Sequence, residues 1–221
     1  MYCVIVGDII KSSEIKPDLR ILLYNSAKSV FSSVNQKYEK AILTQFGIVR
    51  GDAFEGVLNE WHYAPDIIQD IIKGFYAISG TRVRISAVIG ELTIISGDRN
   101  ETDGPAFINA FKHLDTLKTN TNNHWLQLTF QTGTIVDPII EGMIRLLIVL
   151  TEGWTDKQRE IAWIYDSQKM LQKNVSEALG ISRTNVNRQL KAAKYTEYKY
   201  AWDSLEIYLK NIKNLYINDR M

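Results

Sequence analysis

The chain has 221 residues, of which 45% are hydrophobic and 23% are charged, and its formal net charge at pH 7 is +1. This composition is that of an ordinary soluble globular protein, and the charge balance gives no overall attraction to nucleic acid. The single cysteine, Cys3, excludes an intramolecular disulfide and a cysteine-based zinc site. The short apolar run at the N-terminus, without a basic lead, predicts no signal peptide, and the most apolar helix, at 139–150, is far short of the roughly 20 residues that span a bilayer. The sequence therefore predicts a cytoplasmic protein with no membrane contact.

The first 131 residues alternate between strand and helix patterns. Residues 1–10 are apolar and β-branched throughout, as in a buried central strand. Gly51-Asp52 is a hairpin turn signal, and Pro105 opens a helix at its first turn. The predicted elements are a strand at 1–10, a helix at 18–42, strands at 44–50 and 53–60, a helix at 67–78, a strand at 82–92, a helix at 105–118 and a strand at 125–131.

This order of elements predicts a ferredoxin-like sheet with helices on one face. After Gly133 no strand signal returns, and the pattern is helical to the end. We therefore predict an α+β protein with two domains. Residues 1–133 form a ferredoxin-like βαββαβ domain, and residues 137–221 form an all-α domain.

Residues 172–191, QKNVSEALGISRTNVNRQLK, have the pattern of a helix-turn-helix. Gly180 stands where the chain must turn sharply, which glycine does without steric cost. Ser182 is placed to cap the second helix, and the small Ser176 allows the two helices to cross closely. The apolar anchors are Val175, Leu179, Val186 and Leu190.

The second helix of this pair leaves polar residues on its other faces, of types that hydrogen-bond to base edges and phosphates. The predicted DNA-binding residues are Arg183, Thr184, Asn185, Asn187, Arg188 and Lys191. Residues 168–200 hold seven Lys/Arg and two Glu, and such a concentration of positive charge is expected of a DNA reader. The alternative is a helical pair retained for dimerisation alone.

The closing helix, predicted at 196–216, carries an apolar stripe at three- and four-residue steps. The stripe includes Tyr198, Trp202, Leu205, Leu209 and Ile212. It packs either within the chain or against a second subunit. A homodimer stays open because helix-turn-helix proteins usually read two half-sites as symmetric dimers.

Two Gly-Asp pairs are the main candidates for a site in the first domain. Gly7-Asp8 ends the first strand, and Gly51-Asp52 forms the tip between the second and third strands. The first and third strands of a ferredoxin-like sheet are neighbours, so we expect both carboxylates to meet at one edge. Close carboxylates need a cation or a proton between them, and carboxylates with substrate phosphates are the usual way to hold magnesium. The alternative is that Asp52 is a turn residue and Asp8 caps a loop.

Further polar residues accompany the two aspartates. Lys11 and Ser12 follow Asp8 and either offer donors to a phosphate or simply begin a polar loop. Arg50 either binds the same ligand or pairs with a carboxylate. Glu55 is either a third acid of the site or a residue on the solvent face. The chain has no strand–GxxxxGK[ST]–helix phosphate loop.

Four segments resemble the class III nucleotide cyclase domain. They are VGDII at 6–10, VRGDAF at 49–54, VRISAVIGE at 83–91, and Gly104 followed by Ala110. The resemblance covers residues 1–131. It implies that Asp8 and Asp52, with the carbonyl of Ile9, hold Mg²⁺ or Mn²⁺ beneath a nucleoside triphosphate.

Other positions depart from the cyclase pattern. The family's purine-selecting lysine falls near Ile48, and its transition-state asparagine and arginine fall near Ile108 and Lys112. Isoleucine cannot donate a hydrogen bond to a developing charge. Lysine offers a point charge rather than a planar fork, so Lys112 is predicted to contact a ligand without replacing the arginine. The domain is predicted to be cyclase-like in shape, and its catalysis stays open.

A resemblance over nearly the whole chain is to the SatD family of bacteria. The segments that carry it are VIVGDIIKSSEI, GDAFEG, RVRISAVIGEL, DGPAF at 103–107 and TDKQRE at 155–160. This resemblance implies the fold, the domain order and a bacterial, cytoplasmic protein, but no reaction.

These patterns together predict a DNA-binding regulatory protein. Its cyclase-like domain would sense a nucleotide or another small phosphate ligand. The first alternative is a divergent metal-dependent nucleotide cyclase or another nucleotidyl-transferring enzyme. The second is a structural, dimerising module in which both sites are vestigial.

Overall fold

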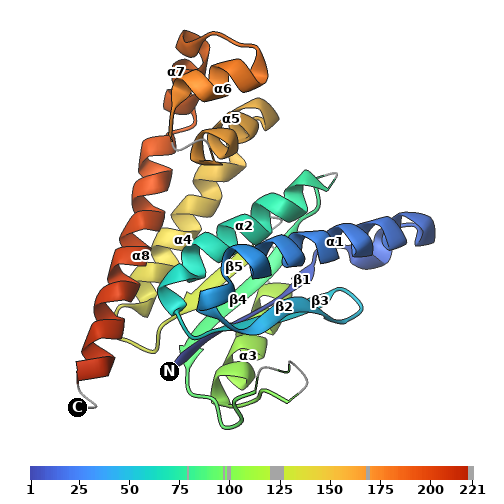
Figure 1. Ribbon diagram of the computed structural model, residues 1–221, viewed down its shortest axis with the longest axis vertical. Helices are drawn as coiled ribbons and strands as arrows, with labels where there is room; N and C mark the ends of the chain where they lie inside the picture. Colours follow the sequence, from blue (N-terminus) through green and yellow to red (C-terminus); the bar gives the residue numbers. More distant parts are fainter. Residues whose placement is uncertain (79, 97, 99–100, 120–126, 168–169, 219–221) are drawn as a thin grey trace.

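The computed structural model describes residues 1–78, 80–96, 98, 101–119, 127–167 and 170–218 (Figure 1). The strands are β1 (Tyr2–Ile9), β2 (Ile42–Arg50), β3 (Ala53–Leu58), β4 (Val83–Gly90) and β5 (Gln127–Gln131). The helices between them are α1 (Pro17–Lys37), α2 (Ala64–Ala77) and α3 (Pro105–Thr119). The chain continues with α4 (Asp137–Glu152), α5 (Asp156–Ser167), α6 (Gln172–Leu179), α7 (Arg183–Ala192) and α8 (Tyr195–Asn218).

The five strands form one sheet in the order β2-β3-β1-β4-β5. Neighbouring strands are antiparallel except β4 and β5, which run parallel. The predicted order of strands and helices up to β5 is confirmed, and so is the pairing of the first and third strands. Asp8 on β1 lies opposite Ala53 on β3 and opposite Arg84 on β4. The predicted start of the last strand, at 125, lies outside the described residues.

Helices cover both faces of the sheet, which corrects the expectation of helices on one face. The helices α1 and α2 lie on one face, and α3 packs against β1, β4 and β5 on the other (Figure 1). The physical reason is the composition of β1, whose residues are apolar on both sides. Val4 and Val6 point toward α3, whereas Cys3 and Ile5 belong to the core beneath α1 and α2. A sheet with two apolar faces needs a layer of helices on each.

The predicted helix at 18–42 is shorter in the structure. The helix α1 ends at Lys37, and Glu39–Ala41 forms a short 3-10 turn before β2. The helix α5 was not delimited by the sequence pattern. We call β1–β5 with α1–α3 the sheet part, and α5, α6 and α7 the three-helix unit.

The helices α4 and α8 run side by side from the sheet part to the three-helix unit at the far end of the molecule (Figure 1). The apolar stripe of α8 is buried against other parts of the same chain, as the first alternative predicted. Its neighbours include α2 and α4.

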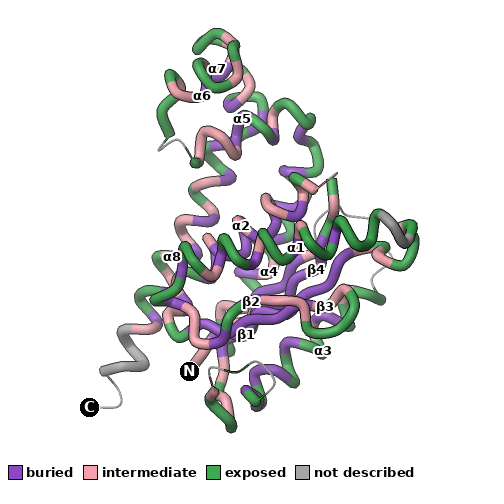
Figure 2. The backbone as a smooth tube through the Cα atoms, turned by 45° about the vertical axis from the view of Figure 1, so that its right-hand side comes forward, coloured by how far each residue is buried: buried purple, intermediate pink, exposed green. Residues whose placement is uncertain are grey.

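One apolar cluster runs from the sheet through α4 and α8 to Val175, Val186 and Leu190. Figure 2 shows the buried residues along the strands. The predicted boundary near 133–137 falls in the turn between β5 and α4, but the core crosses it, so the division into two domains stays a prediction. Among the described helices, none combines the length and the apolar character that a membrane crossing requires.

Candidate functional sites

The three-helix unit is held together by a small apolar core. Its buried members are Ile161 and Ala162 from α5, Val175 from α6, and Val186 and Leu190 from α7. The helices α6 and α7 each pack against α5 and against one another. A helix-turn-helix needs such a support for its second helix, and the assignment of this unit to that class stays a prediction.

The turn between α6 and α7 has the predicted geometry. Gly180 ends α6 in the left-handed region, with φ +63°. The backbone N–H of Asn185 donates to Ser182 Oγ at 3.2 Å, so Ser182 caps α7. Ser176 Oγ donates to the carbonyl of Ile181 and ties the end of α6 to the turn. The turn and cap read from the sequence are therefore confirmed.

Replacing Gly180 with alanine is expected to lower the free energy of unfolding by about 1 kcal/mol, because a Cβ in the left-handed region strains the backbone. Gly142→Ala is the control. Gly142 lies within α4 with nothing within 4 Å of an added Cβ, so alanine there should raise stability by about 0.5–1 kcal/mol. Urea denaturation of the two variants measures both effects. Equal changes at the two glycines would contradict the left-handed role of Gly180.

The polar side of α7 is open to solvent. Arg183, Thr184, Arg188 and Lys191 are exposed, and Asn185 and Asn187 are partly buried. Arg188 Nη2 donates to Asn185 Oδ1 at 3.0 Å, which holds both side chains along the helix. Within the described part of the chain, no acidic side chain pairs with Arg183, Arg188 or Lys191. The six residues predicted to bind DNA thus share one short helix, on which four of them are exposed and the two asparagines are partly covered.

Asp8 is 5% exposed and lies between two cations. Its Oδ1 accepts a hydrogen bond from Arg84 Nη1 at 2.9 Å, and its Oδ2 lies 3.4 Å from Lys118 Nζ of α3. Arg84 Nε also donates to Gln127 Oε1 at 2.7 Å. Asp8 therefore joins β1 to β4 and α3 through charged contacts, which are stronger than neutral ones, and Arg84 extends this network to β5.

Asp52 has different partners. It lies in the β2–β3 turn, and its Oδ2 accepts a hydrogen bond from Ser12 Oγ. Both residues line a hollow of about 710 Å³ beneath the N-terminal half of α1, which we call the α1 hollow. Its other lining residues include Ile9, Arg20, Tyr24 and Ile48. Arg20 Nη2 donates to the carbonyls of Ser12 and Ser13 at 3.3 and 3.4 Å and fixes the loop at the rim.

Strand alternation separates the two aspartates. Asp8 follows Val4 and Val6 on the α3 side of the sheet, where its partner Lys118 lies. Asp52 meets Ser12 on the side of α1. Glu55, which is 7% exposed, lies two residues before Val57 on β3 and therefore points to the same side of the sheet. Val57 packs on the α3 side, so Glu55 shares that side with Asp8. The sequence pattern left the side of Glu55 open. The spacing of two residues between Glu55 and the apolar Val57 was the signal that could have assigned Glu55 to a buried side of the sheet.

The residues around Asp8 do not fit a divalent metal ion. Both carboxylate oxygens already face cations, and an ion bound there would be repelled by Arg84 and Lys118. In the described chain, no group of three or more His, Cys, Asp or Glu side chains is arranged to hold a metal. A site formed jointly by Asp8, Asp52 and the carbonyl of Ile9 therefore stays a prediction, and one that these ion pairs oppose.

The residues predicted to bind a ligand are spread over the sheet part. Ser12 lines the α1 hollow. Lys11 stands next to it, with φ 58°, and lies 3.5 Å from the carboxylate of Glu14. Arg50 is exposed at the end of β2, and Lys112 is exposed on α3, on the other face of the sheet. The sequence pattern did not single out Arg20 or Tyr24, because an amphipathic helix gives no sign of which end borders a hollow.

These observations define an α+β protein with a five-stranded sheet that is covered by helices on both faces and followed by further helices. A profile of the SatD family matches residues 2–213, and the chain belongs to that family. Comparison with curated proteins gives no match.

Several solved structures resemble part of the chain. A bacterial light-regulated adenylyl cyclase is 16% identical, with a TM-score of 0.44, over 58% of this chain and 74% of that one. The monomeric guanylyl cyclase domain of RhoGC from the aquatic fungus Blastocladiella emersonii is 17% identical, with a TM-score of 0.43, over 52% and 74% of the two chains. The adenylyl cyclase CyaB from P. aeruginosa is 15% identical, with a TM-score of 0.43, over 52% and 71%.

Proposed function

We propose that the protein is a DNA-binding regulator in which α7 enters the major groove and the sheet part binds a small ligand. The observation that carries the proposal is the two-sided character of α7. Val186 and Leu190 anchor one side, while Arg183, Arg188 and Lys191 remain exposed on the others. A helix with a free row of arginine, asparagine and lysine has the groups that base edges and phosphates accept.

Binding of duplex DNA tests the proposal directly. We expect fluorescence anisotropy to show binding that weakens with salt, with a slope of log K against log salt of roughly −3 per copy if the three exposed cations of α7 each neutralise a phosphate. Two copies per duplex are expected, because helix-turn-helix proteins commonly read paired half-sites. Absence of binding at low salt would contradict the proposal.

The ligand proposed for the sheet part is a nucleotide or a small phosphate compound that enters the α1 hollow. In support, Ser12 offers a hydroxyl, the guanidinium of Arg20 lies among the lining residues, and Ile9 and Ile48 line an apolar wall. The volume is within the range of sites for small molecules. A ligand alters DNA binding only if it favours one of two conformations of the protein.

The alternative function is that of a divergent cyclase or nucleotidyl-transferring enzyme. The observation in its favour is the position of Asp52. This residue of the β2–β3 turn lines the α1 hollow together with Ile9, the last residue of β1, and accepts a hydrogen bond from Ser12. Incubation with each nucleoside triphosphate and Mg²⁺ or Mn²⁺ tests it. Release of pyrophosphate that is lost in Asp52→Ala would replace the regulator proposal for the sheet part. We expect no release.

A further inference from the structure

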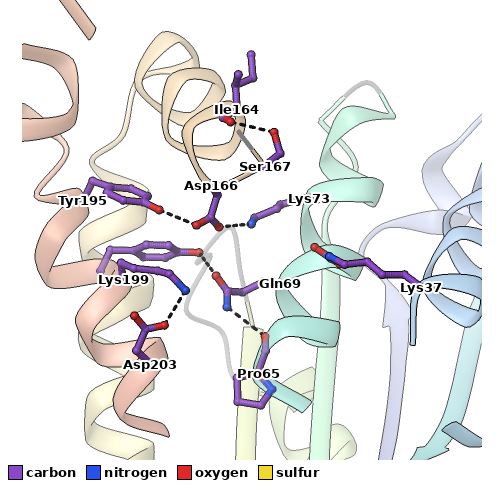
Figure 3. Close-up of polar contacts among 12 residues, drawn as sticks. Lys37, Pro65, Gln69, Lys73, Ile164, Asp166, Ser167, Tyr195, Lys199 and Asp203 are labelled. Carbon is purple, nitrogen blue, oxygen red and sulfur yellow. Dashed lines mark hydrogen bonds and ion pairs between the residues drawn. The ribbon is translucent and has the colours of Figure 1, made fainter. Parts of the chain in front are cut away.

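One face of α2 contacts helices α5 and α8. Gln69, Lys73 and Tyr76 follow one another at steps of four and three residues, so they share a face of the helix. Each of them reaches a residue of α5 or α8 (Figure 3 shows the first two). Tyr198 OH donates to Gln69 Oε1 at 3.1 Å, Lys73 Nζ lies 2.6 Å from Asp166 Oδ2, and Tyr76 OH donates to Asp156 Oδ1 at 2.8 Å.

Asp166 is the centre of this contact. Besides Lys73 of α2, it accepts a hydrogen bond from Tyr195 OH of α8 at 2.6 Å, so one carboxylate joins α2, α5 and α8 (Figure 3). The side chains of Lys73 and Asp166 are only 20% and 17% exposed. Burial acts to raise the pKa of Asp166, but the charge of Lys73 and the hydrogen bonds from Lys73 and Tyr195 outweigh it and lower that pKa. The carboxylate is therefore ionised at neutral pH.

A second contact lies one turn further along α2. The guanidinium of Arg159, on α5, sits 4.8 Å from the ring centre of Tyr76. Trp163 of the same helix meets Tyr76 edge-on, with ring centres 5.2 Å apart. Such cation–π and edge-to-face contacts are directional. They fix the angle between α5 and α2.

The position of α7 depends on that of α5, because α6 and α7 both pack against α5, and α7 also packs against α8. On the other side, α2 packs against α1, and α1 supplies Arg20 and Tyr24 to the α1 hollow. The contact centred on Asp166 thus lies between the helix that borders the hollow and the helix with the open cationic side.

We propose that Lys73, Asp166 and Tyr195 form a latch that fixes the three-helix unit against α2. Opening the latch frees the unit to swing on α4 and α8 without unfolding the sheet part. The latch itself rests on geometry alone. Its consequence for DNA binding rests on the function proposed above.

Paired spin labels test the latch in the full-length protein. Cysteines replacing the exposed Ser29 on α1 and Ala192 on α7 carry the labels, and pulsed electron paramagnetic resonance gives the distribution of distances between them. Lys73→Met, alone and with Tyr195→Phe, should raise the ratio of open to closed forms by roughly tenfold to a hundredfold, the range for lost hydrogen bonds to charged groups. The distance distribution should broaden accordingly.

The matched control is Lys37→Met. Lys37 Nζ also lies 2.6 Å from an aspartate, Asp70 Oδ2, which belongs to the same helix α2 but faces α1. Its loss should leave the distribution as narrow as in the wild type. Asp166→Asn preserves the shape of the side chain and should broaden the distribution as Lys73→Met does, which guards against misfolding of a single variant.

The outcomes separate the latch from the proposed function. Distributions that are identical in the wild type, Lys73→Met with Tyr195→Phe, and Asp166→Asn overturn the latch, whatever the protein does with DNA. A distribution that broadens in these variants but not in Lys37→Met supports it. If the distribution broadens and the wild type binds no DNA, the latch stands and the regulator proposal fails.

Discussion

Asp8→Asn is expected to lower the free energy of unfolding by about 3 kcal/mol, at the low end of the range for breaking a buried ion pair by removing one partner. Arg84, whose side chain is 20% exposed, would keep its bond to Gln127 and lose the charge that neutralises it. Lys118 already lies 3.2 Å from Asp115 and would lose less. The cost therefore falls mainly on Arg84. Chemical denaturation of the wild type and the variant measures it.

Asp52→Asn is the control for this experiment. Asp52 belongs to the equivalent Gly-Asp pair but is only partly buried and bonds to a neutral hydroxyl. Its replacement should cost about 1 kcal/mol or less. The structural role assigned to Asp8 would be wrong if both variants lost equally little.

A metal titration distinguishes the two roles of Asp8. Because Arg84 and Lys118 already neutralise its carboxylate, we expect Mn²⁺ to leave the thermal midpoint of the wild type unchanged. A ligand that binds the folded state alone raises the midpoint by mass action. A rise with Mn²⁺ that disappears in Asp8→Asn would identify Asp8 as a metal ligand and reverse the assignment.

The local features of the three-helix unit could be predicted from the sequence. Gly180 and Ser182 act within a few residues of their own positions, through φ and a capping bond, so composition and spacing are sufficient to place them. The order of strands up to β5 followed for the same reason, because hydrophobic periodicity and turn signals are local.

The candidate metal site could not be predicted in the same way. Proximity of the two Gly-Asp pairs follows from topology, and Asp8 does lie opposite Ala53. The side of the sheet to which each carboxylate points depends on strand alternation and on distant partners. Lys118, which meets Asp8, comes from α3, which packs on the face opposite α1 and α2, whereas the prediction had all helices on one face. Long-range ion pairs of this kind leave no periodic mark in a sequence.

The tail shows the same limit on a larger scale. The apolar stripe of α8 predicts that Tyr198 and Trp202 are buried, and both are buried in the structure. It does not say against what, and part of the answer is α2, through Gln69. The packing of α8 against α2 and α4 makes the apolar core continuous across the predicted domain boundary.

Arg188→Ala is expected to weaken binding to a preferred DNA sequence by about 1–3 kcal/mol, if its guanidinium reads a base edge. Arg188 lies midway along the exposed side of α7, and its hydrogen bond to Asn185 orients both groups before DNA arrives. Asn185→Ala should therefore weaken binding as well, partly through loss of that orientation. Anisotropy titrations with the preferred and a scrambled duplex measure the effect.

Lys210→Ala is the charge-matched control for this prediction. Lys210 is exposed on α8, where it pairs with Glu206 at 2.6 Å, three residues before the contact of Lys213 with Glu60 of the sheet part. Its removal changes the net charge as Arg188→Ala does, but far from α7. A base-reading role requires that Arg188→Ala reduce the preference for one sequence over the other, whereas a phosphate contact lowers both affinities alike and reduces the salt slope by about 1. Equal affinities for Arg188→Ala, Lys210→Ala and the wild type would remove Arg188 from the set of DNA-binding residues and leave the role of α7 to Arg183 and Lys191, which are also exposed.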